Sequence, residues 1–422
     1  MLLSFRFANH RSFRDEQQLN LTPVYADGLP DEHAPEAVTV AGIFGANASG
    51  KSNTLDALTY MRRLTLRSDR EVEPGEGIRR SPFRLVPEIA DEPSRYVVDL
   101  LLEGVRHTYG FSIDDRRVLE EWLYTYPHNR QRKIFEREGS DFAWGEESGK
   151  EKELPRIAEI TASTALFVST IARFDLRKSG PHSKPTHAIY RWFRQVDAGL
   201  DDGTKTAHRP ICWVQDAPQR DLVISLLRAA DVGISDVVVV APRADPTVLA
   251  QLSTVQAERA EILRSRLQFI HCGADGDTAL DLADESAGTR RILALAARCV
   301  DTLSIGALMS VDEIDASLHP MLTAKMIGLF QSERTNPRRS QLLFTSHDAT
   351  LLGTFDADEV LHRDQVWFTE KDHHGASTLF PFSEFKPRKQ GENRQRRYLN
   401  GSYGAVPDLS KDLFEQALTA RG

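Results

Sequence analysis

The sequence predicts an α/β fold in which a mixed sheet is combined with an antiparallel β meander and an inserted, largely helical region. Three observations predict this class. A short apolar run at 38–44 precedes a glycine-rich turn and a helical pattern, strand-like runs alternate with turns over 83–126, and strands alternate with helices again after residue 280.

The composition is that of an ordinary globular protein, because 41% of the 422 residues are hydrophobic and 27% are charged. The net charge of −8 argues against a generic basic nucleic-acid coat, although the segment 386–397 is locally basic. No apolar run approaches the roughly 18 residues of a membrane span, and the N-terminus does not resemble a signal peptide. We therefore expect a cytoplasmic protein that does not bind membranes. The widely spaced cysteines argue against a disulfide framework and a zinc ribbon; they are Cys212, Cys272 and Cys299.

The N-terminal part is expected to begin with two strands within residues 1–22, joined around an Asn-His-Arg-Ser-Phe turn at 9–13. A Pro- and Asp-rich loop follows at 23–37, and 38–44 is expected to be a buried parallel strand. The helix after the glycine-rich turn is expected to extend through residue 66.

Four segments are expected along the chain. Residues 1–130 would form the first part of a head domain, 131–270 a mainly helical insertion, 271–385 the rest of the head, and 386–422 a basic C-terminal segment. Inside the insertion, helices are expected at 219–230 and 247–267 and a strand at 237–240.

The C-terminal part of the head returns to alternating elements. An amphipathic helix is expected at 289–303, a strand at 305–311, a second helix at 319–330 and a second strand at 341–345. This order is typical of strands that lie parallel in one sheet.

The turn after the first apolar strand has the spacing G-x-x-x-x-G-K-S over residues 45–52. Gly45 and Gly50 let the backbone curl so that successive N–H groups face a phosphate, and the following helix adds its positive N-terminal end. Lys51 would reach the β- and γ-phosphates as a point charge, and the Ser52 hydroxyl would bind Mg²⁺.

Two carboxylates, Asp312 and Glu313, end the expected strand at 305–311, and His347 follows the strand at 341–345. Parallel strands deliver their C-terminal residues to the same crevice. Asp312 would position Mg²⁺ through its water shell, Glu313 would be the general base toward the attacking water, and His347 would contact the γ-phosphate or orient that water. By themselves, two acids after a strand are as compatible with a surface turn, and a lone histidine is usually structural.

A second anion site is expected where the helix at 289–303 begins. Ser286, Gly288 and Thr289 place small residues and free backbone N–H groups at a helix start. An ordinary capped helix is the alternative interpretation of the same residues.

In this order, the motifs resemble those of ABC-class ATPase heads, which include the SMC, RecF and OLD proteins. The resemblance is greatest to prokaryotic AAA-type ATPases of the RecF/OLD-like kind. It rests on Asn-x-Arg-Ser-Phe at 9–13, the Asp-Glu-Ile-Asp-Ala-Ser-Leu-His-Pro block at 312–320 and Arg-Tyr-Leu-x-Gly-x-Tyr-Gly-Ala-x-Pro at 397–407. It spans nearly the whole chain, but residues 130–270 contribute little beyond their spacing. The implied fold is an ABC-type P-loop ATPase head.

The resemblance implies a composite active site in a head-to-tail homodimer with two sandwiched ATP molecules. The signature of one subunit would close on the ATP held by Lys51 of the other, and Asp315 would lie in the loop that links the two sites. The implied Mg²⁺ ligands are Ser52 and Asp312. The implied ATP contacts are Gly45, Asn47, Ser49, Gly50, Lys51, Ser52, Asn53, Ser286, Gly288, Thr289 and Asp315. The signature differs from the Leu-Ser-Gly-Gly-Gln of transporters, and the segment 81–85 lacks the glutamine of a metal-contacting loop.

OLD proteins carry a C-terminal Toprim nuclease, and the 75 residues after His347 are too few for that domain. The chain therefore resembles the ATPase half of a two-gene anti-phage system whose effector, a nuclease or toxin, is a separate protein. Three alternatives stay open. The protein could be a RecF-like or SMC-like DNA-repair ATPase with DNA as its partner, an ATP-bound scaffold that sequesters a toxin, or a transporter ATPase. The resting assembly could also be larger than a dimer.

Overall fold

The structure is a computed structural model that describes residues 1–25, 36–71, 76–146, 148–151, 153–174, 184–199, 217–230, 233–240, 266–355, 358–385 and 393–407. The chain divides into two compact units. Unit 1 comprises Met1–Val196, Val311–Glu313 and Gln341–Gly422, and unit 2 comprises Asp197–Ser310 and Ile314–Ser340. The boundaries expected at residues 130 and 270 do not coincide with these units, and the expected division into four segments stays a prediction.

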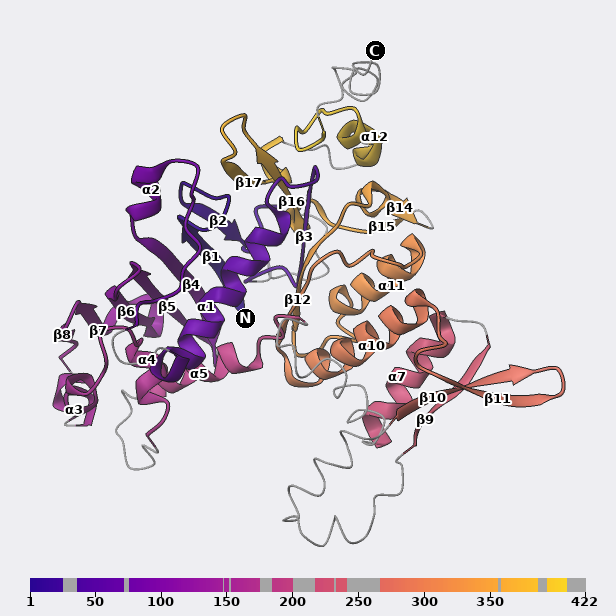
Figure 1. Ribbon diagram of the computed structural model, residues 1–422, viewed down its shortest axis with the longest axis horizontal. Helices are drawn as coiled ribbons and strands as arrows, with labels where there is room; N and C mark the ends of the chain where they lie inside the picture. Colours follow the sequence, from indigo (N-terminus) through magenta and orange to yellow (C-terminus); the bar gives the residue numbers. More distant parts are fainter. Residues whose placement is uncertain are drawn as a thin grey trace, which may run out of the picture. The chain divides into compact units, whose positions relative to one another are not determined.

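Unit 1 contains a seven-stranded antiparallel sheet in the order β2-β1-β4-β5-β6-β7-β8 (Figure 1). The predicted N-terminal strand pair and the predicted meander are confirmed. The meander is longer than expected, because two strands continue into the region assigned to the helical insertion. In β7 only Ile134 and Phe135 are apolar, and they are adjacent, so the sequence lacks the alternation that would have indicated a strand. The strands are β1 (Leu2–Ala8), β2 (Gln17–Asn20), β4 (Ser94–Leu102), β5 (Val105–Ile113), β6 (Val118–Tyr126), β7 (Arg132–Glu138) and β8 (Asp141–Trp144).

A mixed five-stranded sheet, in the order β12-β13-β3-β16-β17, confirms the predicted α/β class. Its central strand pairs in parallel with β13 and β16, and every residue of β3 and β13 is buried. Burial on both faces explains why these strands are continuous apolar runs in the sequence. The strands are β3 (Val40–Gly45), β12 (Leu308–Val311), β13 (Gln341–Thr345), β16 (Val366–Lys371) and β17 (Ser377–Pro381).

The strand expected at 305–311 is shorter than predicted. The preceding helix continues to Ile305, and Gly306 ends it with a φ of 73°. Glycine adopts this left-handed conformation without the steric cost that a Cβ would add. An apolar run alone does not reveal where such a helix stops and a buried strand begins.

Helix α1 (Lys51–Glu71) follows β3 directly and is longer than the predicted helix. Its apolar face is buried and packs against α4 (Phe167–Ile171) and α5 (Lys184–Gln195). Two shorter helices of unit 1 are α2 (Pro87–Asp91) and α3 (Glu153–Glu159). The 3-10 helices are η1 (Pro127–Asn129), η2 (Ser148–Lys150), η3 (Ala349–Leu352), η4 (Arg363–Gln365) and η5 (Phe382–Phe385).

The turn at 9–13 fastens the start of α1 to the meander. The Nε2 atom of His10 donates to Asp56 of α1 at 2.8 Å, and its Nδ1 atom lies 2.8 Å from the hydroxyl of Tyr96 in β4. Arg11 adds two hydrogen bonds to the same Asp56 carboxylate. The amide of Asn53, also in α1, donates to the Ser12 hydroxyl at 2.7 Å. This motif therefore holds the helix that carries the glycine-rich turn.

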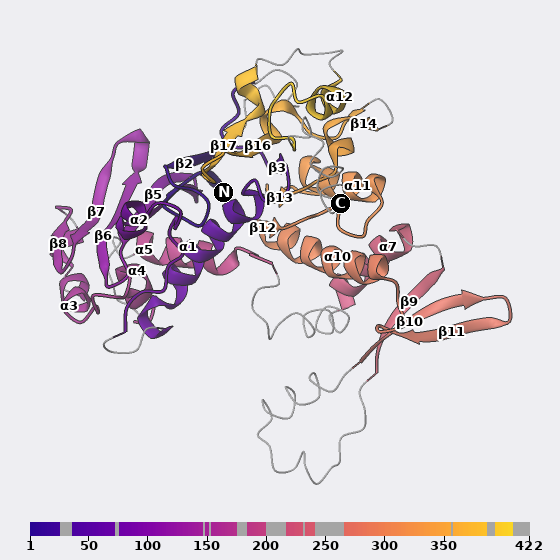
Figure 2. The ribbon, with the colours of Figure 1, turned by 45° about the horizontal axis from the view of Figure 1, so that its top comes forward.

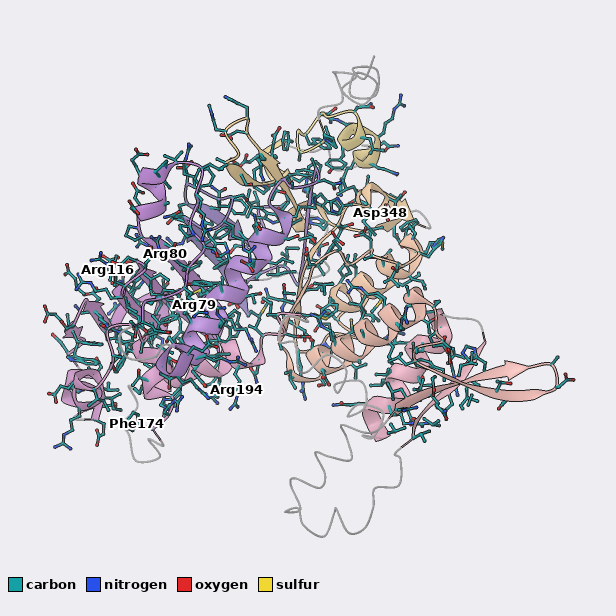
Figure 3. The ribbon with its side chains drawn as sticks, in the orientation of Figure 1. Arg79, Arg80, Arg116, Phe174, Arg194 and Asp348 are labelled. Carbon is teal, nitrogen blue, oxygen red and sulfur yellow. The ribbon has the colours of Figure 1, made fainter. Side chains whose placement is uncertain are left out.

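A buried arginine adds a second brace near this turn. The guanidinium of Arg80 donates to the carboxylate of Asp115 and to the carbonyls of Ala90 and Glu92 (Figure 3). The side chain is only 1% exposed, so these acceptors replace the water that its charge would otherwise require.

Unit 2 consists of helices packed on a three-stranded antiparallel sheet in the order β11-β10-β9. The β10–β11 hairpin extends away from α7 and α10 (Figure 2). Helix α7 and strand β9 agree with the predictions, whereas β10 and β11 were not predicted. The helix expected at 247–267 lies outside the described residues except for its last two, which belong to β10. The elements are α7 (Ala217–Ala230), β9 (Ile234–Val240), β10 (Arg266–Gly273), β11 (Gly276–Asp281), α10 (Ala287–Ile305) and α11 (Pro320–Gln331).

The C-terminal part of unit 1 contains β14 (Thr354–Phe355), β15 (Asp358–Glu359) and α12 (Arg394–Leu399). The part of the basic segment that the structure describes stabilises the fold. Arg394 is buried and donates to the Leu361 carbonyl at 2.8 Å and to the Glu359 carboxylate at 2.7 Å. Among the described helices, none is both long and apolar enough to cross a bilayer.

Candidate functional site

The glycine-rich turn lies in unit 1 between the last residue of β3 and the first residue of α1. Gly45 and Gly50 have φ angles of 157° and 117°, and Ala48 has a φ of 60°. A Cβ atom on Gly45 would come within 2.4 Å of the Thr369 carbonyl oxygen, and one on Gly50 within 2.7 Å of the Ser377 hydroxyl. The loop therefore keeps its curl only with glycine at these two positions.

Lys51 is folded back into this curl. Its buried ammonium group donates to the carbonyl oxygens of Gly45 at 2.8 Å and Ala46 at 2.9 Å. It also lies 3.4 Å from Nδ1 of His347, which brings two predicted site residues together. An ammonium group can only donate, so Nδ1 is the acceptor in this contact.

The carboxylate of Asp312 is hydrogen-bonded to the first turn of α1 and to the end of β13. Its Oδ1 atom accepts a hydrogen bond from the Ser52 hydroxyl at 2.9 Å and from the Thr345 hydroxyl at 2.5 Å. The Thr345 hydroxyl in turn accepts from the backbone N–H of Glu313 at 2.8 Å. The sequence did not single out Thr345; the available signal was its place at the C-terminal end of a parallel strand.

Glu313 carries its side chain toward solvent from an unusual backbone conformation. Its φ is 49°, a left-handed value that costs a non-glycine residue about 1–2 kcal/mol and recurs at functional sites. Its side chain is 56% exposed, and Oε1 lies 3.8 Å from Nε2 of His347. The strained residue after β12 thus presents an exposed carboxylate beside Nε2 of the imidazole.

The position of His347 is supported from the next residue. The Asp348 carboxylate caps the following 3-10 helix by accepting from the Thr350 backbone N–H at 2.9 Å and from its hydroxyl at 2.7 Å (Figure 3). The chain therefore turns sharply after β13, which leaves the imidazole at the strand end.

The remaining predicted residues of the loop differ in exposure. Asn47 is exposed, whereas the Ser49 side chain is buried and its hydroxyl lies 2.7 Å from that of Thr369. Asn53 is half-buried, and its amide is bonded to Ser12. Of these three predicted contacts, Asn47 has the side chain most accessible to a ligand.

The late motif at 397–407 also borders the glycine-rich turn. Burial raises the pKa of the Tyr398 phenol to about 12, and a hydrogen bond with the backbone of Gly45 opposes that rise. The phenol therefore stays protonated at neutral pH and donates to the Ala405 carbonyl at 3.2 Å. This contact gives the motif a structural role next to the loop.

The predicted second anion site lies in unit 2. Ser286 is the N-cap of α10, and its hydroxyl accepts from the Thr289 backbone N–H at 3.0 Å. Ser286 is exposed, whereas Thr289 is buried. A Cβ on Gly288 would approach the Ser317 carbonyl oxygen to 3.0 Å, so the loop containing Asp315 packs directly on this helix start. Among the residues that the structure describes, none forms a hydrogen bond with the buried Oδ1 atom of Asp315, which is unusual for a carboxylate.

The donor atoms at Asp312 suit a magnesium ion better than a protein-enclosed metal. Within the described ranges, no group of three or more His, Cys, Asp or Glu residues could hold a metal ion. Mg²⁺ typically takes one or two protein oxygens and completes its octahedron with phosphate and water oxygens. The paired oxygens of Ser52 and Asp312 match that requirement.

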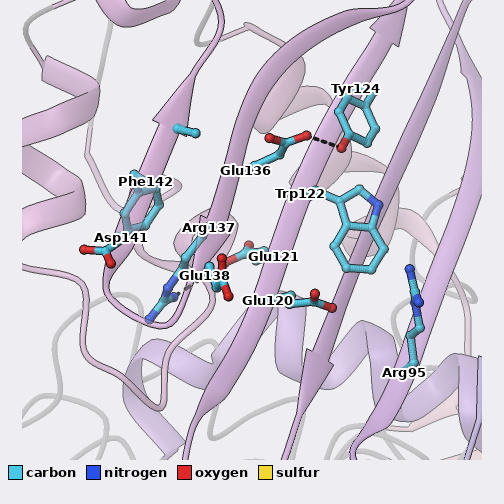
Figure 4. A pocket seen from close by; sticks show the side chains of 11 residues that line it. Arg95, Glu120, Glu121, Trp122, Tyr124, Glu136, Arg137, Glu138, Asp141 and Phe142 are labelled. Atoms are coloured by element: carbon cyan, nitrogen blue, oxygen red, sulfur yellow. Dashed lines mark hydrogen bonds and ion pairs between the residues drawn. The ribbon is translucent and has the colours of Figure 1, made fainter.

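A groove of about 510 Å³ lies elsewhere in unit 1, on one face of the seven-stranded sheet (Figure 4). Its floor includes Trp122, whose ring lies over Gly110; a Cβ on Gly110 would come within 2.5 Å of that ring. None of the predicted site residues lines it. The candidate site is therefore the loop and the strand ends, not this groove.

Comparison with known proteins places the chain among nucleotide-dependent enzymes. A family model described as "AAA domain, putative AbiEii toxin, Type IV TA system" matches residues 40–353. None of the curated proteins matches the chain.

Several solved structures are similar to the chain at low sequence identity. An SMC head bound to the C-winged helix domain of ScpA is 10% identical, with 91% of this chain and 99% of that chain covered at a TM-score of 0.46. The SMC head domain from Thermotoga maritima is 12% identical, with 90% and 98% covered at a TM-score of 0.40. An Smc head domain from Pyrococcus furiosus, bound to the C-terminal domain of ScpA, is 12% identical, with 91% and 97% covered at a TM-score of 0.40.

Substituting Gly45 by alanine should destabilise the loop, because the added Cβ overlaps the Thr369 carbonyl. We expect a loss of about 2–4 kcal/mol, from the clash and the strained φ together. Thermal unfolding followed by circular dichroism measures this loss. Gly104→Ala is the matched control, since Gly104 has a φ of 75° but no atom within 4 Å of the added Cβ. Equal melting temperatures for the two variants would contradict the tight packing of the loop.

Proposed function

Because the chain belongs to this AAA-domain family of P-loop ATPases, we propose that it is an ATP-driven switch that closes on Mg²⁺·ATP and reopens after hydrolysis. The phosphate loop of residues 45–52 would hold the phosphates, with Lys51 as the positive charge at the β- and γ-phosphates. A bound Mg²⁺ would neutralise phosphate charge, and Ser52 and Asp312 would hold it.

The hydrogen-bonded chain from Ser52 through Asp312 and Thr345 to Glu313 carries this proposal. It brings together a hydroxyl that would bind the metal, a carboxylate that would position it and a residue that would be the general base. Glu313 would accept a proton from the attacking water, and its exposed side chain leaves room for that water. His347, between Lys51 and Glu313, would contact the γ-phosphate through its Nε2 proton.

We further propose that the active form is a head-to-tail homodimer in which each signature acts on the ATP of the other subunit. The start of α10 supports this, because Ser286 is exposed and a 19-residue helix directs its positive end outward there. Gly288 would bring its backbone N–H group to the phosphates, and Thr289 would hold the Ser286 cap in place through its own N–H. Asp315, in the loop that packs on this helix start, would lie at the interface.

The biological role that we propose is the ATPase component of a cytoplasmic anti-phage system with a separate effector, a nuclease or toxin. The family description, which names a toxin–antitoxin system, supports this role. The test is a plaque assay in cells carrying the whole gene pair. Lys51→Ala and Glu313→Gln should each abolish protection, because neither completes the cycle of closing and opening. Full protection by Lys51→Ala would contradict the proposal.

A RecF-like or SMC-like ATPase that acts on DNA is the second candidate. Exposed arginines on two helices that pack together favour it; they are Arg63 and Arg70 of α1 and Arg191 and Arg194 of α5. If this candidate is correct, duplex DNA should stimulate ATP hydrolysis, and the stimulation should fall steeply with rising salt concentration.

Glu313→Gln should bind ATP normally but hydrolyse it about 10²–10³-fold more slowly, a barrier increase of about 3–4 kcal/mol. The amide keeps the shape of the side chain but cannot accept the proton of the attacking water. Steady-state phosphate release and nucleotide titration measure the two effects. Glu120→Gln, a carboxylate of the distant groove, is the control that should keep the wild-type rate. A Glu313→Gln variant with wild-type turnover would exclude this residue as the base.

Thr345→Val should lower the hydrolysis rate about tenfold with little change in ATP affinity, because the Glu313 N–H and the Asp312 carboxylate both lose their shared partner. Thr345→Ser retains the hydroxyl and should keep most of the rate. Stopped-flow phosphate release on both variants distinguishes lost hydrogen bonding from lost volume. Equal rates for the valine variant and the wild type would show that this hydroxyl is dispensable.

Ser286→Arg should block dimer closure, since it places a bulky side chain at the exposed start of α10. Single subunits should still bind ATP. Light scattering on the Glu313→Gln background, with and without Mg²⁺·ATP, measures the ATP-dependent dimer. Ser304→Arg, near the opposite end of the same helix, is the matched control and should dimerise. An ATP-dependent dimer of the Ser286→Arg variant would rule out the signature as the interface.

A further inference from the structure

A histidine and a glutamate form a close pair immediately before the signature. The Nε2 atom of His271 donates to Oε1 of Glu285 at 2.7 Å. The Glu285 side chain is only 5% exposed, and the next residue is Ser286, the N-cap of α10. A buried carboxylate needs a partner, so this hydrogen bond holds the chain where the signature begins.

The pairing between β9 and β10 is irregular beside this histidine. The register shifts between Ile270 and His271 because Ser235 of β9 is an extra residue, whereas the pairing of β10 with β11 is continuous there. A β-bulge of this kind bends the strand that carries the extra residue, which here is β9. The hydrogen bond from the Cys272 N–H to the Gly233 carbonyl, at 3.0 Å, continues the contact between the two segments beyond the bulge. His271 therefore lies in the regularly paired β10–β11 hairpin, while its ring reaches the chain just before the helix.

Two further contacts tie the segment before the signature to the same sheet. The Leu282 N–H donates to the Leu267 carbonyl of β10 at 3.3 Å. Leu282 also packs on the apolar core of unit 2, which includes Phe269 of β10 and Leu293 of α10. Leu318, in the loop of Asp315, packs on that core as well. The start of α10, the loop of Asp315 and the three-stranded sheet thus pack together within unit 2. The hydrogen bond between His271 and Glu285 adds a polar contact between the sheet and the start of α10.

We propose that His271 is a positioning residue for the signature and that, through Glu285, it couples the β9–β10–β11 sheet to ATP hydrolysis. The inference rests on the proposed function, in which the start of α10 closes on ATP. His271 would touch neither ATP nor the attacking water. Its effect would be on the rate of the closed dimer and not on the binding of ATP to the phosphate loop.

A second polar pair in unit 2 provides a matched control. Arg220 of α7 donates to both carboxylate oxygens of Asp236 in β9, at 2.6 Å and 2.7 Å. This pair also joins a helix to the sheet, and Arg220 is half-buried like His271. Removing the Arg220 side chain should lower the stability of the fold, as removing the His271 side chain would, without disturbing the segment before Ser286.

The test compares His271→Ala, His271→Gln, Glu285→Ala and Arg220→Ala in the full-length protein. We expect His271→Ala to lower kcat about tenfold, while KM for ATP and the affinity for a fluorescent ATP analogue stay unchanged. Glu285→Ala should lower kcat to the same extent as His271→Ala. The variant that carries both substitutions should be no slower than either single variant, because each substitution removes the same hydrogen bond. His271→Gln retains a donor and should recover most of the rate. The kcat of Arg220→Ala should stay within twofold of the wild-type value, even if its melting temperature falls as far as that of His271→Ala.

Two results would overturn the inference: a His271→Ala variant with the wild-type kcat, or an Arg220→Ala variant slowed as much as His271→Ala. Failure of the proposed function gives a different pattern. In that case Ser286→Arg would itself hydrolyse ATP at the wild-type rate. If only the inference fails, Ser286→Arg is slow and His271→Ala is fast.

Discussion

The hydroxyl group of Thr345 is the interaction on which the candidate site depends. It donates to Asp312 and accepts from the Glu313 backbone, so it joins the ends of β12 and β13 at one point. The Ser52 hydroxyl then ties this point to the first turn of α1. The Asp312 carboxylate and the backbone of Glu313 are therefore held in place before any nucleotide binds. Preorganised groups of this kind lower a reaction barrier without reorganising during the reaction.

Much of this site could be predicted because parallel strands end at the same edge of a sheet. That rule brought Lys51, Asp312 and His347 together from positions almost 300 residues apart, and the structure agrees. Thr345 was not predicted as a site residue because threonine is common in strands. Its role becomes visible only when the end of β12 is known to lie beside the end of β13. The strands β7, β10 and β11 were not predicted because charged or polar residues break the alternation of apolar and polar positions, although Asp275-Gly276 is a hairpin turn signal between β10 and β11.

The turn at 9–13 shows how a sequence motif can serve the site without touching a ligand. His10 and Arg11 both bind Asp56, and Ser12 binds Asn53, so three side chains of the turn fasten the first turns of α1. The signature in unit 2 is supported in a comparable way by packing of the Asp315 loop and by the pair before Ser286. In both places, buried polar contacts orient an exposed backbone end toward solvent, where an anionic ligand would approach.

In the proposed dimer, each ATP is hydrolysed between the phosphate loop of one subunit and the signature of another. The decisive experiment mixes the Lys51→Ala and Ser286→Ala proteins, since each lacks one part of the site and neither adds bulk that would block closure. A heterodimer contains one site with an intact Lys51 and an intact Ser286 from opposite subunits. ATP hydrolysis should rise on mixing above the rates of the two variants alone, to at most about a quarter of the wild-type rate per chain. No increase, with heterodimers demonstrated by crosslinking, would contradict the shared site.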